Sequence, residues 1–337
     1  MIKMRIAVRA PNWIGDSILA IPCLRSLKTN FPDSHITIVA KNWVKDVFLH
    51  LEFVDDILTI PDKNDIKSLK STAKKLKKCE FDTGLLLTNS FLSALLFYMA
   101  GIPERWGYKK EGRQILLTKS VSKKNQREKI HQVQYYQNLI LSLGLKTNLP
   151  NLHISATKKE KDLAKEFLLS FNLDPQKKFA VLNPGAYYGS AKRWPVSKYK
   201  ELVKILQKKT NLNLLIIGSQ AEADLARSIS ANLEEKPINI AGKTSIRMLA
   251  GIISLAHLVI SNDSGPMHLS NALGIPVVAL FGPTVPAVTR PFHRPYRVIK
   301  KDVPCWPCSY RECPYDHQCM LKISPQEVAS ECEEFMS

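Results

Sequence analysis

The feature that most constrains the fold is a regular alternation of short apolar runs, rich in β-branched residues, with longer amphipathic stretches. Eight runs of this kind divide evenly between the two halves of the 337-residue chain, at 4–9, 35–41, 57–60, 83–87, 179–183, 213–218, 257–261 and 277–281. Such an alternation is typical of βα units around a parallel sheet. It predicts an α/β protein of doubly wound sheets.

The two halves resemble each other more than they resemble one extended sheet. A charged stretch at 156–178 ends in a breaker sequence and marks the junction, and the length suits two domains of ordinary size. We expect Rossmann-like domains at 1–165 and 166–337. The second would include a Cys-rich segment at 303–320 and a terminal helix. This helix could pack on its own domain or back on the first domain.

Ligands of open α/β sheets bind beyond the carboxyl ends of the strands. With two facing domains, we therefore expect the site in a central cleft. Between the first two strands, apolar residues from Ile14 to Phe31 recur at helical spacing. Pro22 lies inside this helix and should bend it or shift its start.

A tight turn, NDSG at 262–265, follows a predicted strand and opens a stretch with the composition of a helix. Ser264 and Gly265 at a helix start leave backbone N–H groups pointing outward, and the positive end of the helix dipole adds to them. This arrangement suits a phosphate, and His268 lies one turn into the helix. An ordinary N-cap before a core helix remains the alternative.

Other residues near strand ends favour the phosphate interpretation. Lys192 and Arg193 follow the first strand of the second half, in a loop that also holds Gly185 and Gly189. Their charge could meet a leaving diphosphate, with Lys acting as a compact point charge. Glu222, past another strand, is suited to accept hydrogen bonds from ribose hydroxyls, although Glu is also common at helix starts.

The first half has no glycine-rich phosphate loop. Its first strand is instead followed by Gly15 and Asp16, which put a carboxylate at a helix start. A carboxylate there makes sense if it accepts a proton from an acceptor hydroxyl. An Asp N-cap is the alternative, and the two roles can overlap.

Several motifs together resemble glycosyltransferase family 9, which contains the ADP-heptose:lipopolysaccharide heptosyltransferases. They are NPGA at 183–186, AKRWP at 191–195, and NDSG at 262–265 with His268. WIGD at 13–16, TNSF at 88–91 and AGIP at 100–103 most resemble the heptosyltransferase II branch of the family. The resemblance extends over nearly the whole chain.

The resemblance implies a GT-B fold and an inverting transfer that needs neither metal nor cofactor. The donor would be ADP-L-glycero-D-manno-heptose, and the acceptor the first heptose of the inner core on Kdo–lipid A. Asp16 would be the general base. The donor would be bound by Lys192, Arg193, Glu222, Asp263, Ser264, Gly265 and His268, and the acceptor by Asn12, Asn89 and Ser90. Heptosyltransferase I, another family 9 transferase and a sugar-nucleotide epimerase of similar fold are the alternatives.

The chain is strongly basic, with a formal net charge of +18. Lysine-rich stretches at 63–78 and 109–129 carry much of the excess, and a positive rim of this kind would meet anionic lipid; a solvated basic surface is the alternative. No signal peptide or nucleic-acid motif is visible. We expect a cytoplasmic protein, peripheral at the inner leaflet of the inner membrane, that binds no nucleic acid.

Five of the seven cysteines lie near the C-terminus. Cys305, Cys308, Cys313 and Cys319 have enough ligands for a tetrahedral zinc site, but their spacing is tighter than in paired zinc knuckles. A redox pair and packed free thiols are the alternatives, so these residues are weak metal candidates only.

Overall fold

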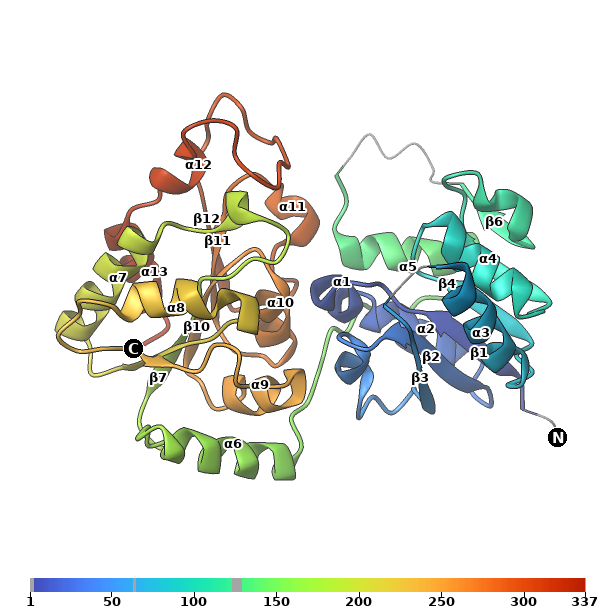
Figure 1. Ribbon diagram of the computed structural model, residues 1–337, viewed down its shortest axis with the longest axis horizontal. Coiled ribbons are helices and arrows are strands. Elements are labelled where there is room, and N and C mark those ends of the chain that lie inside the picture. The colour runs from blue at the N-terminus through green and yellow to red at the C-terminus, as the bar shows by residue number, and fades with distance from the viewer. Residues whose placement is uncertain (1–2, 63–64, 123–128, 337) are drawn as a thin grey trace. The chain divides into compact units, whose positions relative to one another are not determined.

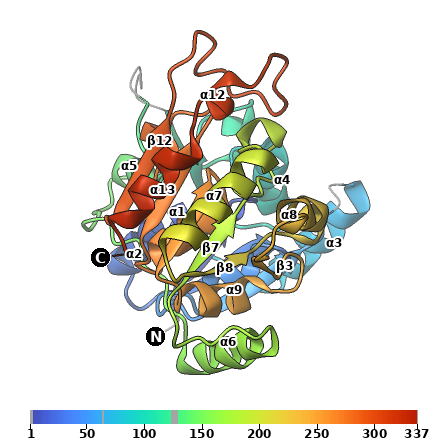
Figure 2. The same ribbon diagram turned by 90° about the vertical axis from the view of Figure 1, so that its left-hand side faces the viewer.

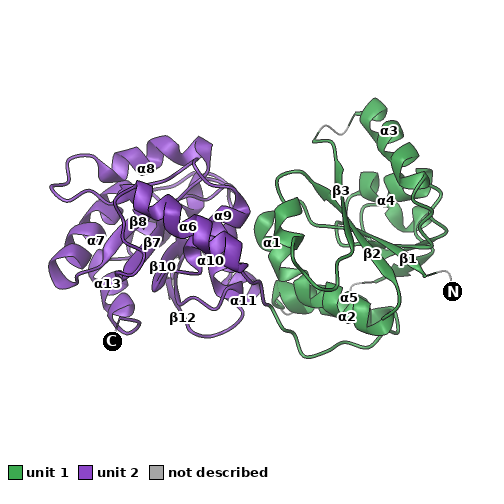
Figure 3. Ribbon diagram, turned by 90° about the horizontal axis from the view of Figure 1, so that it is seen from below, with its two compact units in different colours: residues 1–152 green, residues 153–337 purple. Residues whose placement is uncertain are grey.

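The computed structural model describes residues 3–62, 65–122 and 129–336. The chain forms two compact units, Met1–Leu152 and His153–Ser337 (Figure 3). Each unit is built on one six-stranded sheet in which all neighbouring strands are parallel. The predicted α/β architecture of two Rossmann-like sheets is therefore confirmed.

The first sheet has the strand order β3-β2-β1-β4-β5-β6. The strands are β1 (Arg5–Arg9), β2 (His35–Lys41), β3 (Asp56–Ile60), β4 (Thr83–Leu86), β5 (Glu104–Tyr108) and β6 (Lys119–Val121) (Figure 1). Helices α1 (Ile14–Leu19), α2 (Ile21–Asn30) and α5 (Gln132–Ser142) lie on one face, and α3 (Ile66–Lys77) and α4 (Phe91–Met99) on the other (Figure 3). Short 3₁₀ helices η1 (Lys45–Phe48) and η2 (Arg113–Leu116) complete the unit.

The second sheet has the order β12-β11-β10-β7-β8-β9. The strands are β7 (Phe179–Asn183), β8 (Asn213–Ile216), β9 (Ile238–Asn239), β10 (Leu258–Asn262), β11 (Val277–Phe281) and β12 (Tyr296–Lys300). The helices are α6 (Lys158–Ser170), α7 (Val196–Lys209), α8 (Ala223–Ser230), α9 (Ile246–Ile253), α10 (Gly265–Ala272), α11 (Pro286–Thr289), α12 (Gln318–Leu321) and α13 (Pro325–Glu333), with 3₁₀ helices η3 (Ser190–Lys192) and η4 (Gln220–Glu222).

Alternate residues of the central strands fill two separate cores of the second unit. Leu182, Ile260 and Leu280 pack with α7, α8 and α13, whereas Ala279 and Phe281 pack with α10 on the opposite face. Figure 2 shows α13 beside α7. This alternation is what a parallel sheet covered on both faces requires.

The order of strands reverses between β1 and β4 in the first sheet and between β7 and β10 in the second. At such a point the loops leaving two adjacent strands diverge, and the crevice at their carboxyl ends is where open α/β sheets bind ligands. Most candidate residues of both units follow these strands, and Glu222 follows the neighbouring strand β8.

The helix predicted from Ile14 is divided into α1 and α2 at Ala20, and Pro22 lies in the first turn of α2. The expected effect of Pro22 is confirmed, because a proline is accommodated where its missing N–H has no partner to lose.

The units divide at 152/153, before the expected boundary at 165/166. The reason is that α6 packs on α9 within the second unit, where Arg247 pairs with Glu160 at 2.6 Å. The terminal helix α13 packs on α7 and β11 of the same unit, and Lys209 pairs with Glu333.

The described part of the first lysine-rich stretch forms α3. Residues 63–64 of that stretch and 123–128 of the second lie outside the described residues. In the part of the chain that is described, no helix combines the length and apolar character needed to cross a bilayer.

Candidate active site

The carboxyl edge of the second sheet holds a buried ion pair. Lys192 Nζ, at the end of η3, lies 2.5 Å from Asp263 Oδ2, which directly follows β10. The two side chains are 11% and 4% exposed. The hydroxyl of Thr284, which follows β11, donates to the same carboxylate oxygen at 2.7 Å. The carboxylate thus fixes the ammonium group at the strand ends.

Helix α10 begins next to this pair without a side-chain cap. Ser264 occupies the N-cap position, but its hydroxyl accepts a hydrogen bond from the Asn183 amide at 2.7 Å instead of bonding to its own helix. Gly265 and Pro266 follow in the first turn, and His268 is 3% exposed. Ser264 therefore leaves the first N–H groups of α10 to other partners, as the phosphate interpretation requires.

Two asparagines tie β7 and β10 together at this edge. Besides Ser264, the Asn183 amide donates to Ser261 at 2.8 Å, and the Asn262 amide donates to the Pro184 carbonyl at 2.7 Å. All these groups lie at the reversal point of the sheet. The turn after β10 is thereby held rigidly against the loop after β7.

Glu222 lies over the backbone of Gly185. A Cβ atom built on Gly185 would come within 2.2–2.5 Å of the Glu222 carboxyl group, so a larger residue there would displace this carboxylate. Glu222 also completes a capping box, with Oε2 accepting from the N–H and the hydroxyl of Ser219, both at 2.8 Å. The side chain is 9% exposed. The capping box uses only Oε2, so Oε1 can still accept a hydrogen bond from a ligand.

The loop that carries Lys192 rests on the Cys-rich segment. The N–H of Ala191 donates to the Arg311 carbonyl at 3.0 Å, and the Ala191 carbonyl lies 2.8 Å from His317 Nε2. A Cβ atom on Gly189 would lie 2.1 Å from the Arg311 carbonyl oxygen. Arg193, next to Lys192, is half-buried and contacts the Ala186 carbonyl at 3.4 Å.

Asp16 lies on α1 of the first unit, three positions after the N-cap. The N-cap is Trp13, so the alternative of Asp16 as a cap residue is wrong. Burial raises the pKa of Tyr135 and that of Tyr136, and the charge of Asp16 adds to both shifts. The carboxylate thus lies within electrostatic reach of two phenols of α5.

Asn89, beyond β4, is held by a buried arginine. Arg113 is fully buried and donates to Asn89 Oδ1 at 3.3 Å and to the carbonyl oxygens of Thr88 and Tyr108. The Asn89 amide donates to the Tyr135 hydroxyl at 2.8 Å. Burial lowers the pKa of Arg113. Asn89, Tyr135 and Asp16 are thereby gathered near the strand ends of the first unit.

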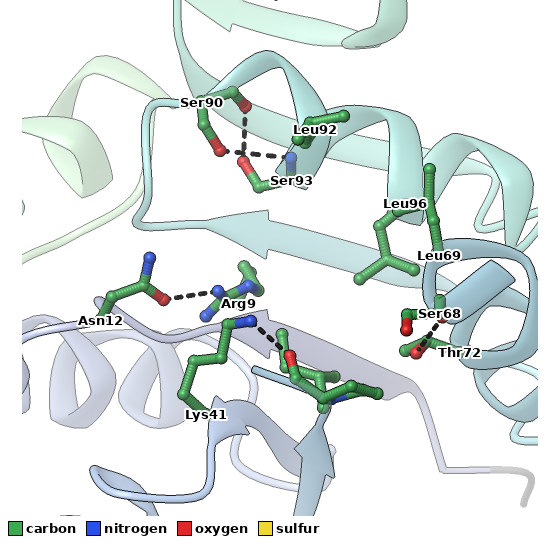
Figure 4. A pocket seen from close by; sticks show the side chains of 12 residues that line it. Arg9, Asn12, Lys41, Ser68, Leu69, Thr72, Ser90, Leu92, Ser93 and Leu96 are labelled. Carbon is green, nitrogen blue, oxygen red and sulfur yellow. Dashed lines mark hydrogen bonds between the residues drawn. The ribbon is translucent and has the colours of Figure 1, made fainter. Parts of the chain in front are cut away.

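Asn12 and Ser90 line a pocket at the carboxyl ends of the first sheet (Figure 4). Asn12 Oδ1 accepts from the Arg9 guanidinium at 2.6 Å. Ser90 caps α4 and accepts from the N–H of Ser93 at 3.3 Å. Both residues lie on the edge that holds Asn89.

The C-terminal cysteines are free thiols. Cys319 is buried, and burial raises its pKa to about 11, with smaller contributions from Cys313, Cys308 and Cys305. Among the residues that the structure describes, no three His, Cys, Asp or Glu side chains are grouped as metal ligands.

The sequence did not reveal three features of the site. They are the hydrogen bond from Thr284 to Asp263, the hydrogen bond from Asn183 to Ser264, and the contacts of Arg311 and His317 with the Lys192 loop. Thr284 could have been found, because FGPT at 281–284 ends the strand next to the one that carries Asp263. The support of the Lys192 loop had no local signal.

The chain is similar to one protein family and to several known proteins along almost its whole length. Residues 69–318 match the model of "Glycosyltransferase family 9 (heptosyltransferase)". The chain is 31% identical to the lipooligosaccharide heptosyltransferase 2 of Campylobacter jejuni serotype O:6, over 97% of this chain and 98% of that protein. It is 28% identical to the lipopolysaccharide heptosyltransferase 2 of Salmonella typhimurium, over 99% of each.

Among solved structures, the chain resembles the E. coli ADP-heptose lps heptosyltransferase II with a TM-score of 0.85 and 27% identity. The similarity covers 99% of this chain and 98% of that one. Both units of the fold therefore have counterparts in that structure.

Proposed function

The chain belongs to glycosyltransferase family 9, the heptosyltransferase family, and we propose that it catalyses an inverting heptose transfer in lipopolysaccharide synthesis. The donor is ADP-L-glycero-D-manno-heptose, and the acceptor is the first heptose of the inner core on Kdo–lipid A. The heptosyltransferase 2 relatives, aligned over almost their full length, support this reaction. The observation that carries the proposal is Lys192, held by Asp263 beside the start of α10.

The second unit binds the donor in this proposal. When the bond from the anomeric carbon to the ADP oxygen breaks, negative charge develops on the diphosphate. Lys192, Arg193 and the first N–H groups of α10 stabilise that charge without rearranging, which is the effective form of electrostatic catalysis. Glu222 accepts from the ribose hydroxyls, while Ser264, Gly265 and His268 contact the diphosphate. No metal or cofactor takes part.

The first unit supplies the base and binds the acceptor. Asp16 takes the proton of the attacking hydroxyl as its oxygen bonds to the anomeric carbon on the face opposite the departing ADP, which inverts the configuration. General-base help of this kind is typically worth about 10²–10⁴-fold. Asn12, Asn89 and Ser90 orient the acceptor sugar beside it.

The test is heptose addition to a Kdo–lipid A acceptor that already carries one heptose. With ADP-heptose, mass spectrometry should show a gain of one heptose. If only an acceptor without the first heptose is extended, the chain acts as heptosyltransferase I. Absence of transfer to both acceptors, with the protein folded, would refute the proposal.

The role of Asp16 is tested by Asp16→Ala. The variant should bind ADP as the wild type does but lose transfer by at least about 10²-fold, because only the base is removed. Normal transfer by the variant would show that the base lies elsewhere.

The proposed location is the cytoplasmic face of the inner membrane, where the protein is peripheral. Helices α3 and α4 pack together. On α3, Lys67, Lys70 and Lys74 are exposed, and on α4 Leu92 and Tyr98 are 42% and 54% exposed. Basic and apolar groups on neighbouring helices suit an anionic bilayer surface.

A further inference from the structure

Tyr188 contacts both the proposed donor site and the Cys-rich segment. It belongs to the loop that follows β7 and precedes Lys192 in that loop. The Lys192 ammonium lies over the Tyr188 ring, 4.8 Å from the ring centroid. The phenol hydroxyl donates to the Ser309 carbonyl at 2.8 Å. One side chain therefore joins the lysine of the donor site to the Cys-rich segment.

The ring gives Lys192 a contact from a different strand end than Asp263 does. Asp263 follows β10 and accepts from the ammonium with its carboxylate at 2.5 Å and its backbone carbonyl at 3.4 Å. Because lysine has a flexible stem, contacts from two elements restrict it more than contacts with one residue. An aromatic face attracts a cation as a whole rather than through one N–H. The ring can therefore hold the ammonium without taking the N–H that a diphosphate needs.

The contact between ring and lysine is partly shielded from water. Tyr188 is half-buried, and the Lys192 side chain is 11% exposed. Cation and ring attract each other within roughly 6 Å, and the attraction is strongest where water is excluded. The contact therefore has the distance and the surroundings that it needs to orient Lys192.

The ring is itself held in place by the Cys-rich segment. Besides the hydrogen bond to Ser309, the Arg311 guanidinium lies 5.3 Å from the ring centroid. The N–H of Ser309 donates to the Pro283 carbonyl at 3.0 Å, in the loop that follows β11. Ser309 thereby joins the loop after β11 to the loop after β7, and both of these loops lie at the proposed donor site.

We propose that Tyr188 is a positioning residue for Lys192. Its ring fixes the ammonium that meets the diphosphate, and its hydroxyl fixes the ring to the Cys-rich segment. This inference rests on the proposed function, because it needs Lys192 to act on the donor. The Cys-rich segment thereby influences Lys192 through the carbonyl of Ser309.

Two substitutions separate the ring from the hydroxyl. Tyr188→Leu removes the ring and should lower kcat about 3- to 30-fold, the effect of losing one cation–π contact that is shielded from water. Tyr188→Phe keeps the ring and should retain most of kcat. Both variants lose the hydrogen bond to Ser309, so both should melt at a lower temperature than the wild type. If kcat falls equally in both variants, or in neither, the inference is wrong.

A double-mutant cycle tests whether the ring acts through the lysine. Calorimetry measures the affinity for ADP, so this readout does not depend on heptose transfer. Tyr188→Leu should weaken ADP binding about 3- to 30-fold in the wild-type background. It should have little effect in a Lys192→Met background, because one interaction cannot be lost twice. An equal loss in both backgrounds would overturn the inference.

Tyr315→Leu is the matched control for the cycle. Tyr315 belongs to the same Cys-rich segment and is 62% exposed. The control makes the same change of side chain away from Lys192 and should bind ADP as the wild type does. If it weakens ADP binding as much as Tyr188→Leu does, the ring of Tyr188 has no special role.

The ADP measurements also separate this inference from the proposed function. If the cycle shows the expected coupling but the wild type transfers no heptose, the proposed function fails while the role of Tyr188 stands. Normal transfer and normal ADP binding by Tyr188→Leu would overturn the role of Tyr188 alone. A wild-type protein that does not bind ADP would overturn both.

Discussion

Asp263 directly follows β10, where its sequence motif predicts it. We expect it to contribute to the donor site, and its Oδ2 atom accepts from both Lys192 and Thr284. An ammonium group has three N–H donors and a flexible stem. Lys192 Nζ donates to the carboxylate and to the backbone carbonyl of Asp263, at 2.5 and 3.4 Å, which orients its remaining N–H. We therefore interpret Asp263 and Thr284 as positioning residues for Lys192.

Thr284→Val tests this interpretation. The substitution keeps the shape of the side chain but removes the hydroxyl that fixes Asp263, so Lys192 should be less well aimed at the diphosphate. Because hydrogen bonds to charged groups are worth about 1.5–3 kcal/mol, we expect kcat to fall roughly tenfold or more. Steady-state kinetics with ADP-heptose would measure it.

Thr284→Ser keeps the hydroxyl and should retain most of the activity. The decisive comparison is between kcat and KM. If Thr284→Val changes only the donor KM, or if the Ser and Val variants lose equally, the hydroxyl does not act through Lys192.

At the scale of elements, α6 packs on α9 of the second unit, and the ion pair between Glu160 and Arg247 joins the two helices. Burial tends to raise the pKa of Glu160, but hydrogen bonds from Arg247 and Thr157 and the charge of Arg247 outweigh it and lower the pKa to about 2 from 4.5. A carboxylate with a lowered folded-state pKa stabilises the fold fully above the unfolded value. That stabilisation disappears as pH falls from about 4.5 toward 2.

We therefore expect Glu160→Gln to destabilise the protein by about 1–3 kcal/mol at pH 7. Urea unfolding at a series of pH values should show the gap to the wild type shrinking below about pH 4.5. Glu166→Gln, an exposed position on the same helix, is the control. A gap that stays constant down to pH 3 would show that the ion pair does not cause it.

The Cys-rich segment acts on the site through its backbone. Gly189→Ala would bring a Cβ atom onto the Arg311 carbonyl oxygen and push the segment away from the Lys192 loop. We expect a lower melting temperature and a donor KM raised about tenfold, since the aim of Lys192 depends on this support. Arg311→Ala keeps the carbonyl and should change the donor KM much less; equal effects would contradict the backbone explanation.

Both strand-end regions could be predicted from the sequence, because the buried runs locate the strands and parallel strands end at one edge. The contacts that fix the site could not. Thr284 lies 21 residues from Asp263, Arg113 lies 24 from Asn89, and Asn183 lies 81 from Ser264. The two residues of each pair come into contact only because their strands are neighbours in the folded sheet. No spacing along the sequence predicts these contacts. The terminal helix was equally undetermined, because its apolar face fits any exposed core.

At the scale of the whole molecule, the charge of +18 predicts salt-dependent binding to anionic membranes. Vesicles containing phosphatidylglycerol should sediment with the protein, while vesicles of phosphatidylcholine alone should bind it much less. Raising the salt should weaken binding, because the screening length shortens from about 10 Å at 0.1 M to about 3 Å at 1 M. Binding that is independent of salt and lipid charge would refute an electrostatic association.

Two matched triple variants distinguish the contribution of the α3 surface to vesicle binding from that of the total net charge. Each lysine near an anionic surface contributes about 1 kcal/mol, so replacing Lys67, Lys70 and Lys74 with Gln should weaken vesicle binding by roughly 100-fold. Replacing the exposed Lys204, Lys208 and Lys236 of the second unit changes the net charge equally but should have a small effect. Equal losses in the two triple variants would mean that total charge, and not the surface of α3 and α4, brings the enzyme to the membrane.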